Sequence, residues 1–135
     1  MRDDSTLEDR LPVLVVDDEP LVAKATMRTL IHCDHTFETA KNGVEAVEKA
    51  QATRYGLIIM DVNMPNKNGY DATKEIRDYE KQHGLPPTPI LGVTSTDAQA
   101  CLEAGMDDQV DKPFDRAILL EKVAALYQPE IPRAE

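Results

Sequence analysis

The chain has 135 residues, a formal net charge of −10 at pH 7, and a composition that is 41% hydrophobic but only 4% aromatic. This length suits one domain, and the balance of apolar and charged residues excludes a disordered chain. No apolar run approaches the length of a membrane span, and so acidic a chain is a poor candidate for binding nucleic acid.

Short apolar runs then alternate with helical patterns, which is typical of repeated βαβ units and a parallel sheet. Val13–Val16 is apolar without alternation, as expected for a strand buried on both faces. Pro20 suits the first turn of a helix. The inward stripe of this helix would include Val22, Ala25, Thr26, Thr29, Leu30 and Cys33. A short strand is predicted over 36–40, and Asn42 can cap the helix that follows.

The middle of the chain repeats this alternation with clearer boundaries. Leu57–Met60 predicts a second buried strand, and the stretch NMPNKNG (63–69) that follows it consists of turn-forming residues. A helix is predicted over about 71–82. Gly84, with prolines beyond it, marks the end of that helix.

Two shorter strands and two helices complete the pattern. Ile90–Val93 predicts another apolar strand, and a short helix is expected over about 97–104. Val110 lies in a last brief strand, and the final helix has a broad apolar face. That face comprises Leu119, Leu120, Val123, Leu126 and Tyr127. The sequence therefore predicts five strands and five helices in alternation.

Polar side chains follow the predicted strands at the points where the strands end. They are Asp17, Asp18 and Glu19 after the first strand, Asp61 after the third, Thr94 and Ser95 after the fourth, and Lys112 after the fifth. Because the carboxyl ends of parallel strands share one edge of a sheet, and ligands bind at that edge, we expect these side chains to converge.

Such a cluster needs a cation. Two carboxylates about 4 Å apart repel by roughly 4 kcal/mol at an effective dielectric constant near 20, so one pKa would rise unless positive charge lies among them. Carboxylate oxygens are hard ligands, and a site with few of them leaves room for water or phosphate oxygens, which favours Mg²⁺. Lys112 and Thr94 facing this site suit a phosphoryl group, whose oxygens need to be neutralised.

Four segments together resemble the receiver domain of two-component response regulators. They are VLVVDDEP (13–20), GLIIMDVNMPNKNG (56–69), ILGVTST (90–96) and CLEAGMDDQVDKPF (101–114). The resemblance covers about 11–127, and the last segment is most similar to receivers of hybrid histidine kinases. It implies a flavodoxin-like α/β fold, with a five-stranded parallel sheet of order 2-1-3-4-5 flanked by five helices. Outside this receiver domain we expect a flexible acidic segment (1–10) and a C-terminal tail or linker stub (128–135).

The resemblance also implies a reaction and its residues. Asp61 would accept a phosphoryl group from a phosphohistidine of a histidine kinase or phosphotransfer domain, in a Mg²⁺-dependent reaction. Thr94 and Lys112 would each bind an oxygen of that group. The bond between Lys112 and Pro113 would be cis, an isomer that is common only before proline.

The metal site follows from the same resemblance. Asp18 would bind Mg²⁺ directly and Asp17 mainly through a coordinated water, with Asp61 and the backbone carbonyl of Asn63 completing the protein ligands. Asn63 and Thr96 match the two positions that in this family tune dephosphorylation by controlling the access of water.

Two features depart from the family pattern. The position three before the lysine is usually Tyr, Phe or His and acts as a switch, but here it is Gln109. The segment from Thr94 to Lys112 is about four residues, or one helical turn, shorter than expected, so the fourth helix region should be shortened. Both departures fall on the face that usually transmits the signal. The phosphorylation chemistry is therefore expected to be intact, whereas the usual switch is not.

Other functions fit these residues less well. An aspartate-nucleophile phosphatase needs an acid two residues after the nucleophile, where this chain has Asn63. A dinucleotide-binding enzyme needs a glycine loop after the first strand, which is absent here. The segment His-Cys-Asp-His (32–35) has no second ligand pair, so we expect a helix end and no metal site. A receiver-like module that binds partners without phosphorylation remains the alternative.

The expected protein is thus a signalling domain that catalyses only its own phosphorylation and dephosphorylation and acts through protein partners. We expect it to be cytoplasmic, without membrane insertion or direct nucleic-acid binding, and with free thiols at Cys33 and Cys101. The sequence leaves open the cognate kinase, the downstream partner and the formation of a homodimer.

Overall fold

The computed structural model describes residues 10–30, 36–64, 68–94, 98–112 and 115–130. In chain order the elements are β1 (Val13–Val16), α1 (Pro20–Leu30), β2 (Phe37–Ala40), α2 (Gly43–Ala52), β3 (Leu57–Asp61), α3 (Gly69–His83), β4 (Ile90–Thr94), α4 (Ala98–Ala104), β5 (Asp108–Asp111) and α5 (Arg116–Leu126). The strands form one sheet of order β2-β1-β3-β4-β5, and every neighbouring pair is parallel. The predicted fold is confirmed.

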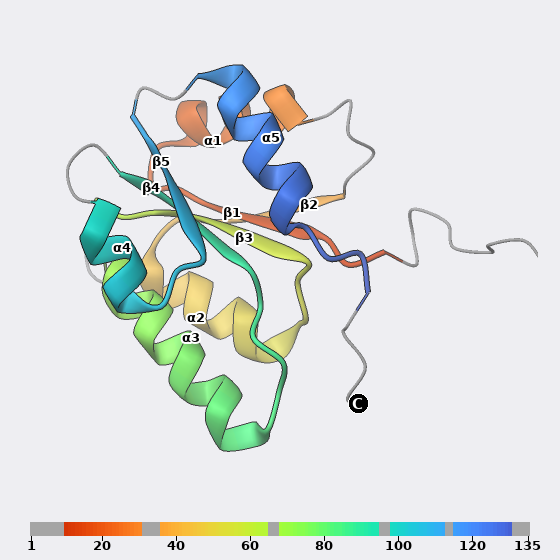
Figure 1. Ribbon diagram of the computed structural model, residues 1–135, viewed down its shortest axis with the longest axis vertical. Helices are drawn as coiled ribbons and strands as arrows, with labels where there is room; N and C mark the ends of the chain where they lie inside the picture. Colours follow the sequence, from red (N-terminus) through yellow and green to blue (C-terminus); the bar gives the residue numbers. More distant parts are fainter. Residues whose placement is uncertain (1–9, 31–35, 65–67, 95–97, 113–114, 131–135) are drawn as a thin grey trace, which may run out of the picture.

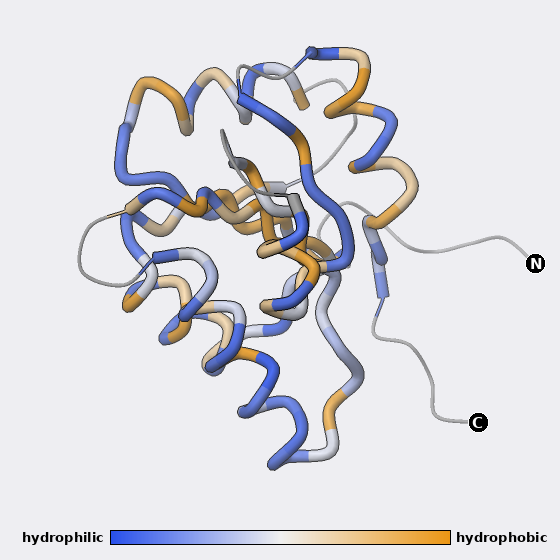
Figure 2. The backbone as a smooth tube through the Cα atoms, turned by 60° about the vertical axis from the view of Figure 1, so that its left-hand side comes forward, coloured by the Kyte–Doolittle hydropathy of each residue, from blue (hydrophilic) through white to orange (hydrophobic). Residues whose placement is uncertain are grey.

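The sheet is covered on both faces. Helices α1 and α5 lie on one face, and α2, α3 and α4 lie on the other (Figure 1). Successive residues of β1 pack alternately, Val13 and Val15 against α1 and α5, and Leu14 and Val16 against the opposite layer. The strands at the centre of the molecule are accordingly the most hydrophobic part of the backbone (Figure 2). Burial on both faces explains why these strands are unbroken apolar runs.

Two asparagine caps and a glycine fix the ends of α2 and α3. Asn42 begins α2 by accepting the Glu45 backbone N–H at 2.8 Å, as the sequence predicted. Asn68 does the same for the Asp71 N–H at 2.9 Å, so α3 begins at Gly69 and not at the predicted position 71. Gly84 ends α3 in the left-handed conformation with φ of 64°. An L side chain rarely adopts this conformation, which accounts for the glycine.

The predicted inward stripe of α1 was partly wrong. Ala25 is exposed, whereas Ala23, Thr26 and Leu30 are buried. Thr26 can be buried because its hydroxyl donates to the Val22 carbonyl oxygen at 3.1 Å. Hydrophobicity alone misplaced the stripe because the buried face contains small and hydroxyl side chains. Position 33, also predicted to face inward, lies outside the described residues.

The two ends of the domain meet at the amino edge of the sheet. The Leu11 N–H donates to the Pro129 carbonyl at 2.9 Å, and the Gln128 N–H donates to the Gly56 carbonyl at 3.0 Å. The first residues of the predicted tail are therefore bonded to the domain. Positions 1–9 and 131–135, predicted to be a flexible segment and a tail, lie outside the described residues. No helix in the described ranges is long and apolar enough to cross a membrane.

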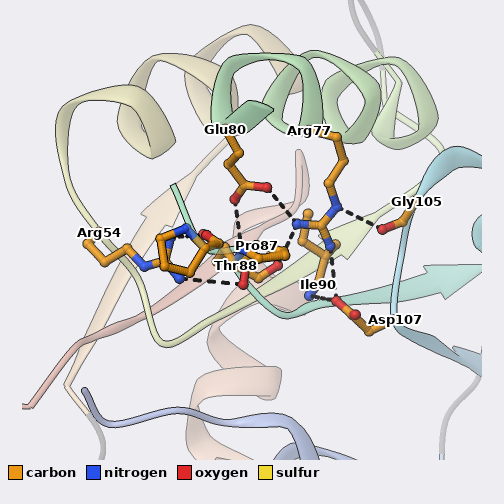
Figure 3. A network of polar contacts seen from close by, with 9 residues as sticks. Arg54, Arg77, Glu80, Pro87, Thr88, Ile90, Gly105 and Asp107 are labelled. Atoms are coloured by element: carbon orange, nitrogen blue, oxygen red, sulfur yellow. Dashed lines mark hydrogen bonds and ion pairs between the residues drawn. The ribbon is translucent and has the colours of Figure 1, made fainter. Parts of the chain in front are cut away.

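A network of polar contacts around Arg77 joins α3 to the segments that flank β4 (Figure 3). The Arg77 guanidinium donates to the Glu80 carboxylate at 2.9 Å and to the Thr88 carbonyl at 2.8 Å. It also donates to the Gly105 carbonyl at 2.9 Å and to the Asp107 carboxylate at 3.0 Å. Glu80 is only 5% exposed, so this arginine neutralises a buried charge.

Replacing Arg77 with Ala should lower the free energy of unfolding by about 3–5 kcal/mol, because the buried Glu80 carboxylate would lose its cation. Urea unfolding measures this loss, and Lys74→Ala, an exposed cation on the same helix, is the control. Arg77→Lys should recover little, since an ammonium cannot form the same fork of bonds. Equal stability of the two alanine variants would contradict this assignment.

Candidate functional site

The carboxyl edge of the sheet gathers the polar residues that follow the strands. Asp17 directly follows β1, Asp61 is the last residue of β3, and Thr94 is the last residue of β4. Lys112 directly follows β5, and its backbone N–H donates to the Thr94 carbonyl at 2.9 Å. Because β1, β3, β4 and β5 are neighbours in the sheet, four separate segments supply one edge.

The structure brings Asp61 and Lys112 into direct contact. The Lys112 Nζ lies 2.8 Å from Asp61 Oδ1, and the Asn63 backbone N–H donates to the same oxygen at 3.1 Å. The Asp61 side chain is 2% exposed and that of Lys112 is 25% exposed. A carboxylate buried to this extent needs a partner of opposite charge, and the lysine supplies it from the far end of the chain.

Asp17 is the second buried carboxylate at this edge of the sheet, with 8% of the residue exposed. Burial raises the pKa of Asp17 from 3.8 to about 6, and the charges of Asp61 and Asp18 add to the rise. A hydrogen bond from the Glu19 backbone N–H at 2.9 Å and the charge of Lys112 oppose it. The ionised form of Asp17 is thus costly, and a cation at this edge would stabilise it.

Three carboxylates could hold that cation. Asp17, Asp18 and Glu19 each offer an oxygen within 4.8 Å of the other two. Asp17 is buried, Asp18 half-buried and Glu19 exposed, so the group opens from the sheet edge toward solvent. Hard oxygen donors of this kind suit Mg²⁺ or Ca²⁺. The sequence placed Glu19 at this edge but did not predict it as a ligand, although its position directly after the acidic pair was the available signal.

The other predicted site residues lie around this centre. Thr94 is fully buried at the end of β4, and Asn63 is exposed just beyond β3. Gln109 lies on β5, and its Oε1 is buried with no hydrogen-bond partner in the described part of the chain. Thr96 and Pro113 lie outside the described residues. The cis bond before Pro113 and the role of Thr96 in dephosphorylation therefore stay predictions.

Helix α4 is the shortest of the five described helices, in line with the short sequence between β4 and β5. Helix α4 has seven residues, whereas the other helices have ten to fifteen. A Cβ atom on Gly92 of β4 would lie 2.4 Å from the Met106 sulfur and 3.1 Å from the Cys101 sulfur. Glycine at this position lets the segment of α4 and the turn after it pack directly on the sheet.

Replacing Asp17 with Asn should stabilise the metal-free chain at neutral pH by on the order of 2 kcal/mol, because the amide removes a carboxylate whose pKa is raised from 3.8 to about 6. The amide oxygen can still accept the Glu19 N–H. Urea unfolding in the presence of a chelator measures the difference. Addition of Mg²⁺ should stabilise the unmodified chain more than the variant, since the variant lacks one carboxylate of the cluster.

The contribution of Asp17 to the free energy of unfolding depends on pH with a defined sign. Between pH 3.8 and about 6 the folded chain binds a proton at Asp17 that the unfolded chain does not bind. The contribution of this group to the free energy of unfolding therefore falls as the pH rises through that window, and it is lost above it. Asp17→Asn should remove this slope. If the Asp17→Asn variant were less stable than the unmodified chain at neutral pH and kept the slope, Asp17 would not be the group with the raised pKa.

Comparison with known proteins identifies related domains. A model of the response regulator receiver domain matches residues 13–124. The sensor histidine kinase RcsC of Salmonella typhimurium is 35% identical over 120 residues, which cover 86% of this chain and 12% of that protein. The hybrid signal transduction histidine kinase M of Dictyostelium discoideum is 33% identical over 120 residues, covering 84% of this chain and 5% of that protein. The chain thus spans a small part of these relatives.

Solved structures with the same fold include two receiver domains that contain Mg²⁺. The receiver domain of the kinase PA1611 from Pseudomonas aeruginosa, with a magnesium ion in its active site cleft, has a TM-score of 0.76 and 32% identity over 87% of this chain and 97% of that one. The receiver domain of CKI1 from Arabidopsis thaliana, complexed with Mg²⁺ and BeF₃⁻, has a TM-score of 0.74 and 29% identity over 85% and 90%.

A further neighbour is bound to a protein partner. The receiver domain of Ssk1 from Saccharomyces cerevisiae, solved with the histidine phosphotransfer protein Ypd1, has a TM-score of 0.82 and 29% identity, over 87% of this chain and 89% of that one. The likeness in each case extends over nearly all of the folded domain.

Proposed function

Because the chain belongs to the response regulator receiver domain family of two-component signalling proteins, we propose that Asp61 accepts a phosphoryl group from a phosphohistidine. The donor would be a histidine kinase or a histidine phosphotransfer domain, as the complex of a related receiver with such a protein suggests. The observation that carries this proposal is the contact of 2.8 Å between Lys112 Nζ and Asp61 Oδ1 at the edge that also holds the acidic cluster.

In the proposed reaction a carboxylate oxygen of Asp61 attacks the phosphorus atom. The phosphorus–nitrogen bond of the donor breaks, and its electron pair returns to the imidazole ring. Lys112 then pairs with an oxygen of the new acyl phosphate, and the Thr94 hydroxyl donates to another. The negative charge of the group in transit is spread over its oxygens, so fixed cations and donors aimed at these oxygens lower the barrier.

The donor set of the acidic edge fits Mg²⁺, which would neutralise charge on the phosphoryl oxygens. Asp18 would be a direct ligand and Asp17 would act mainly through water, with Asp61 and the Asn63 carbonyl completing the set. Two observations favour a cation here, the raised pKa of Asp17 and the proximity of three carboxylate oxygens. Glu19 is exposed, and its place in the cluster makes it a further candidate to orient a metal-bound water.

The outcome of phosphorylation would be read by protein partners. We infer that the chain catalyses only its own phosphorylation and dephosphorylation, with Asn63 and Thr96 controlling the access of water to the acyl phosphate. Its kinship to segments of much longer histidine kinases supports a place in a phosphorelay. Gln109 and the short α4 lie where the family pattern changes, which keeps a receiver-like module without phosphorylation as the second candidate.

Incubation with acetyl phosphate and Mg²⁺ tests the first candidate against the second. The intact mass should increase by one phosphoryl group, and the modification should be lost in alkali, as expected of an acyl phosphate. A two-dimensional NMR titration with Mg²⁺ and beryllofluoride should shift the amide signals at the carboxyl edge. An unchanged mass together with an unchanged spectrum would favour the module that acts without phosphorylation.

A further inference from the structure

A cleft of about 350 Å³ opens between α1 and the turn that joins β2 to α2. It lies toward the β2 side of the sheet, whereas Lys112 follows β5 at the opposite side. Three lysines from three different segments line it, Lys24 on α1, Lys41 in the turn and Lys49 on α2. Its volume is within the range of small-molecule sites, which is about 300–1,000 Å³.

The three ammonium groups have no carboxylate partner among the described residues, whose ion pairs all lie elsewhere. Lys49 Nζ donates to the Thr39 carbonyl at 2.5 Å, which holds this cation beside β2. The Glu45 carboxylate, which also lines the cleft, accepts the Lys41 backbone N–H at 3.0 Å as part of the helix cap. The cleft is lined by three lysines against two carboxylates, Glu45 and Asp17, a small positive excess in a chain of net charge −10.

Part of the wall of the cleft is apolar. Ala23 and Met27 of α1 and Ala40 of β2 line this part. Helix α1 contributes Lys24 to the cleft and contains no acidic residue, so the two carboxylates of the cleft come from outside this helix. The cleft thus combines a compact apolar wall with ammonium groups, which bind phosphate as point charges.

We propose that this cleft is a binding site for a small organic phosphate. The lysines would hold the phosphate group, and the wall of Ala23, Met27 and Ala40 would contact the apolar body of the molecule. The proposal goes beyond phosphorylation of Asp61, because it uses neither that carboxylate nor a metal ion. Asp17 also lines the cleft, so an occupant would lie next to the acidic cluster.

Phenyl phosphate serves as the probe, with the full chain in the presence of a chelator and at fixed ionic strength. Two-dimensional NMR should show saturable shifts of amide signals in 20–27 and 39–49. Inorganic phosphate should bind more weakly, since it lacks a body to fill the apolar wall. Shifts confined to the signals of Thr94 and Lys112, or equal affinity for the two probes, would overturn the proposal.

A matched pair of double variants tests the lysines. Lys24 and Lys41 are exposed, and their side chains make no hydrogen bond in the described part of the chain, so replacing both with Gln should leave the fold intact. The control replaces Lys74 and Lys81, two exposed cations on α3, and changes the net charge equally. The cleft variant should bind phenyl phosphate at least about threefold more weakly, and the control should bind as the unmodified chain does. Equal affinity in the two variants would contradict the site. Failure of Asp61 to accept phosphate would leave this result unaffected.

Discussion

The Asp61→Asn variant is expected to incorporate no phosphate from acetyl phosphate in the presence of Mg²⁺. The amide cannot act as the nucleophile, and no other carboxylate of the edge has the same relation to Lys112, whose Nζ lies 2.8 Å from Asp61 Oδ1. The variant should fold, because the substitution keeps the shape of the side chain and removes a charge that raises the pKa of Asp17. Intact-mass measurement over time gives the result.

The control for this variant is Asp78→Asn, which removes an exposed carboxylate from α3 and should be phosphorylated like the unmodified chain. Far-ultraviolet circular dichroism checks that both variants are folded. Incorporation by Asp61→Asn at the rate of the unmodified chain would place the acceptor on another residue and would remove the basis of the proposed function.

The second large effect is expected from Lys112. Replacing it with Ala should slow phosphorylation about 10²–10³-fold, because the transition state loses a fixed cation that faces the oxygens of the group in transit. Lys122→Ala is the matched control, since Lys122 Nζ also pairs with a carboxylate, that of Asp108, at 2.9 Å but away from the proposed acceptor. The rate of the control should be nearly unchanged.

The loss of Lys112 also leaves the buried Asp61 carboxylate without its cation, so Lys112→Ala should be less stable by about 3–5 kcal/mol in the absence of Mg²⁺. The rates are therefore compared at saturating Mg²⁺, where the divalent ion restores positive charge near Asp61. Lys112→Arg keeps the charge and separates the two effects, because it should fold well and react at an intermediate rate. A rate for Lys112→Ala equal to that of Lys122→Ala would show that Lys112 has no part in the chemistry.

The sequence predicts the centre of the fold well because double-sided burial leaves a strong signal there. Val13–Val16 is a strand with the bounds that the apolar run predicts. Strands β3 and β4 each extend one residue beyond their predicted apolar runs, to Asp61 and Thr94. The edge strand β5 is harder to predict, because Asp108–Asp111 contains only one apolar residue, Val110, and depends on its pairing with β4. The stripe of α1 was misplaced at Ala25 because small and hydroxyl side chains carry little hydropathy signal.

The carboxyl edge could be predicted because topology brings strand ends together whatever the loops do. The contact between Asp61 and Lys112 joins residues 51 positions apart, and only the sheet order makes it foreseeable. Two other features had no local signal. Two of the four bonds of Arg77 go to backbone carbonyls of distant segments, and the lysine cleft gathers Lys24, Lys41 and Lys49 from separate elements. Contacts of this kind depend on helix packing, which the sequence pattern does not specify.

A crystal structure of the chain with Mg²⁺ and beryllofluoride tests the central claim most directly. The account predicts a beryllofluoride group on Asp61, with Lys112 Nζ and the Thr94 hydroxyl bonded to its fluorine atoms and the metal ion among Asp17, Asp18 and the Asn63 carbonyl. A metal ion bound elsewhere, or Lys112 turned away from an unmodified Asp61 at saturating ligand, would contradict it.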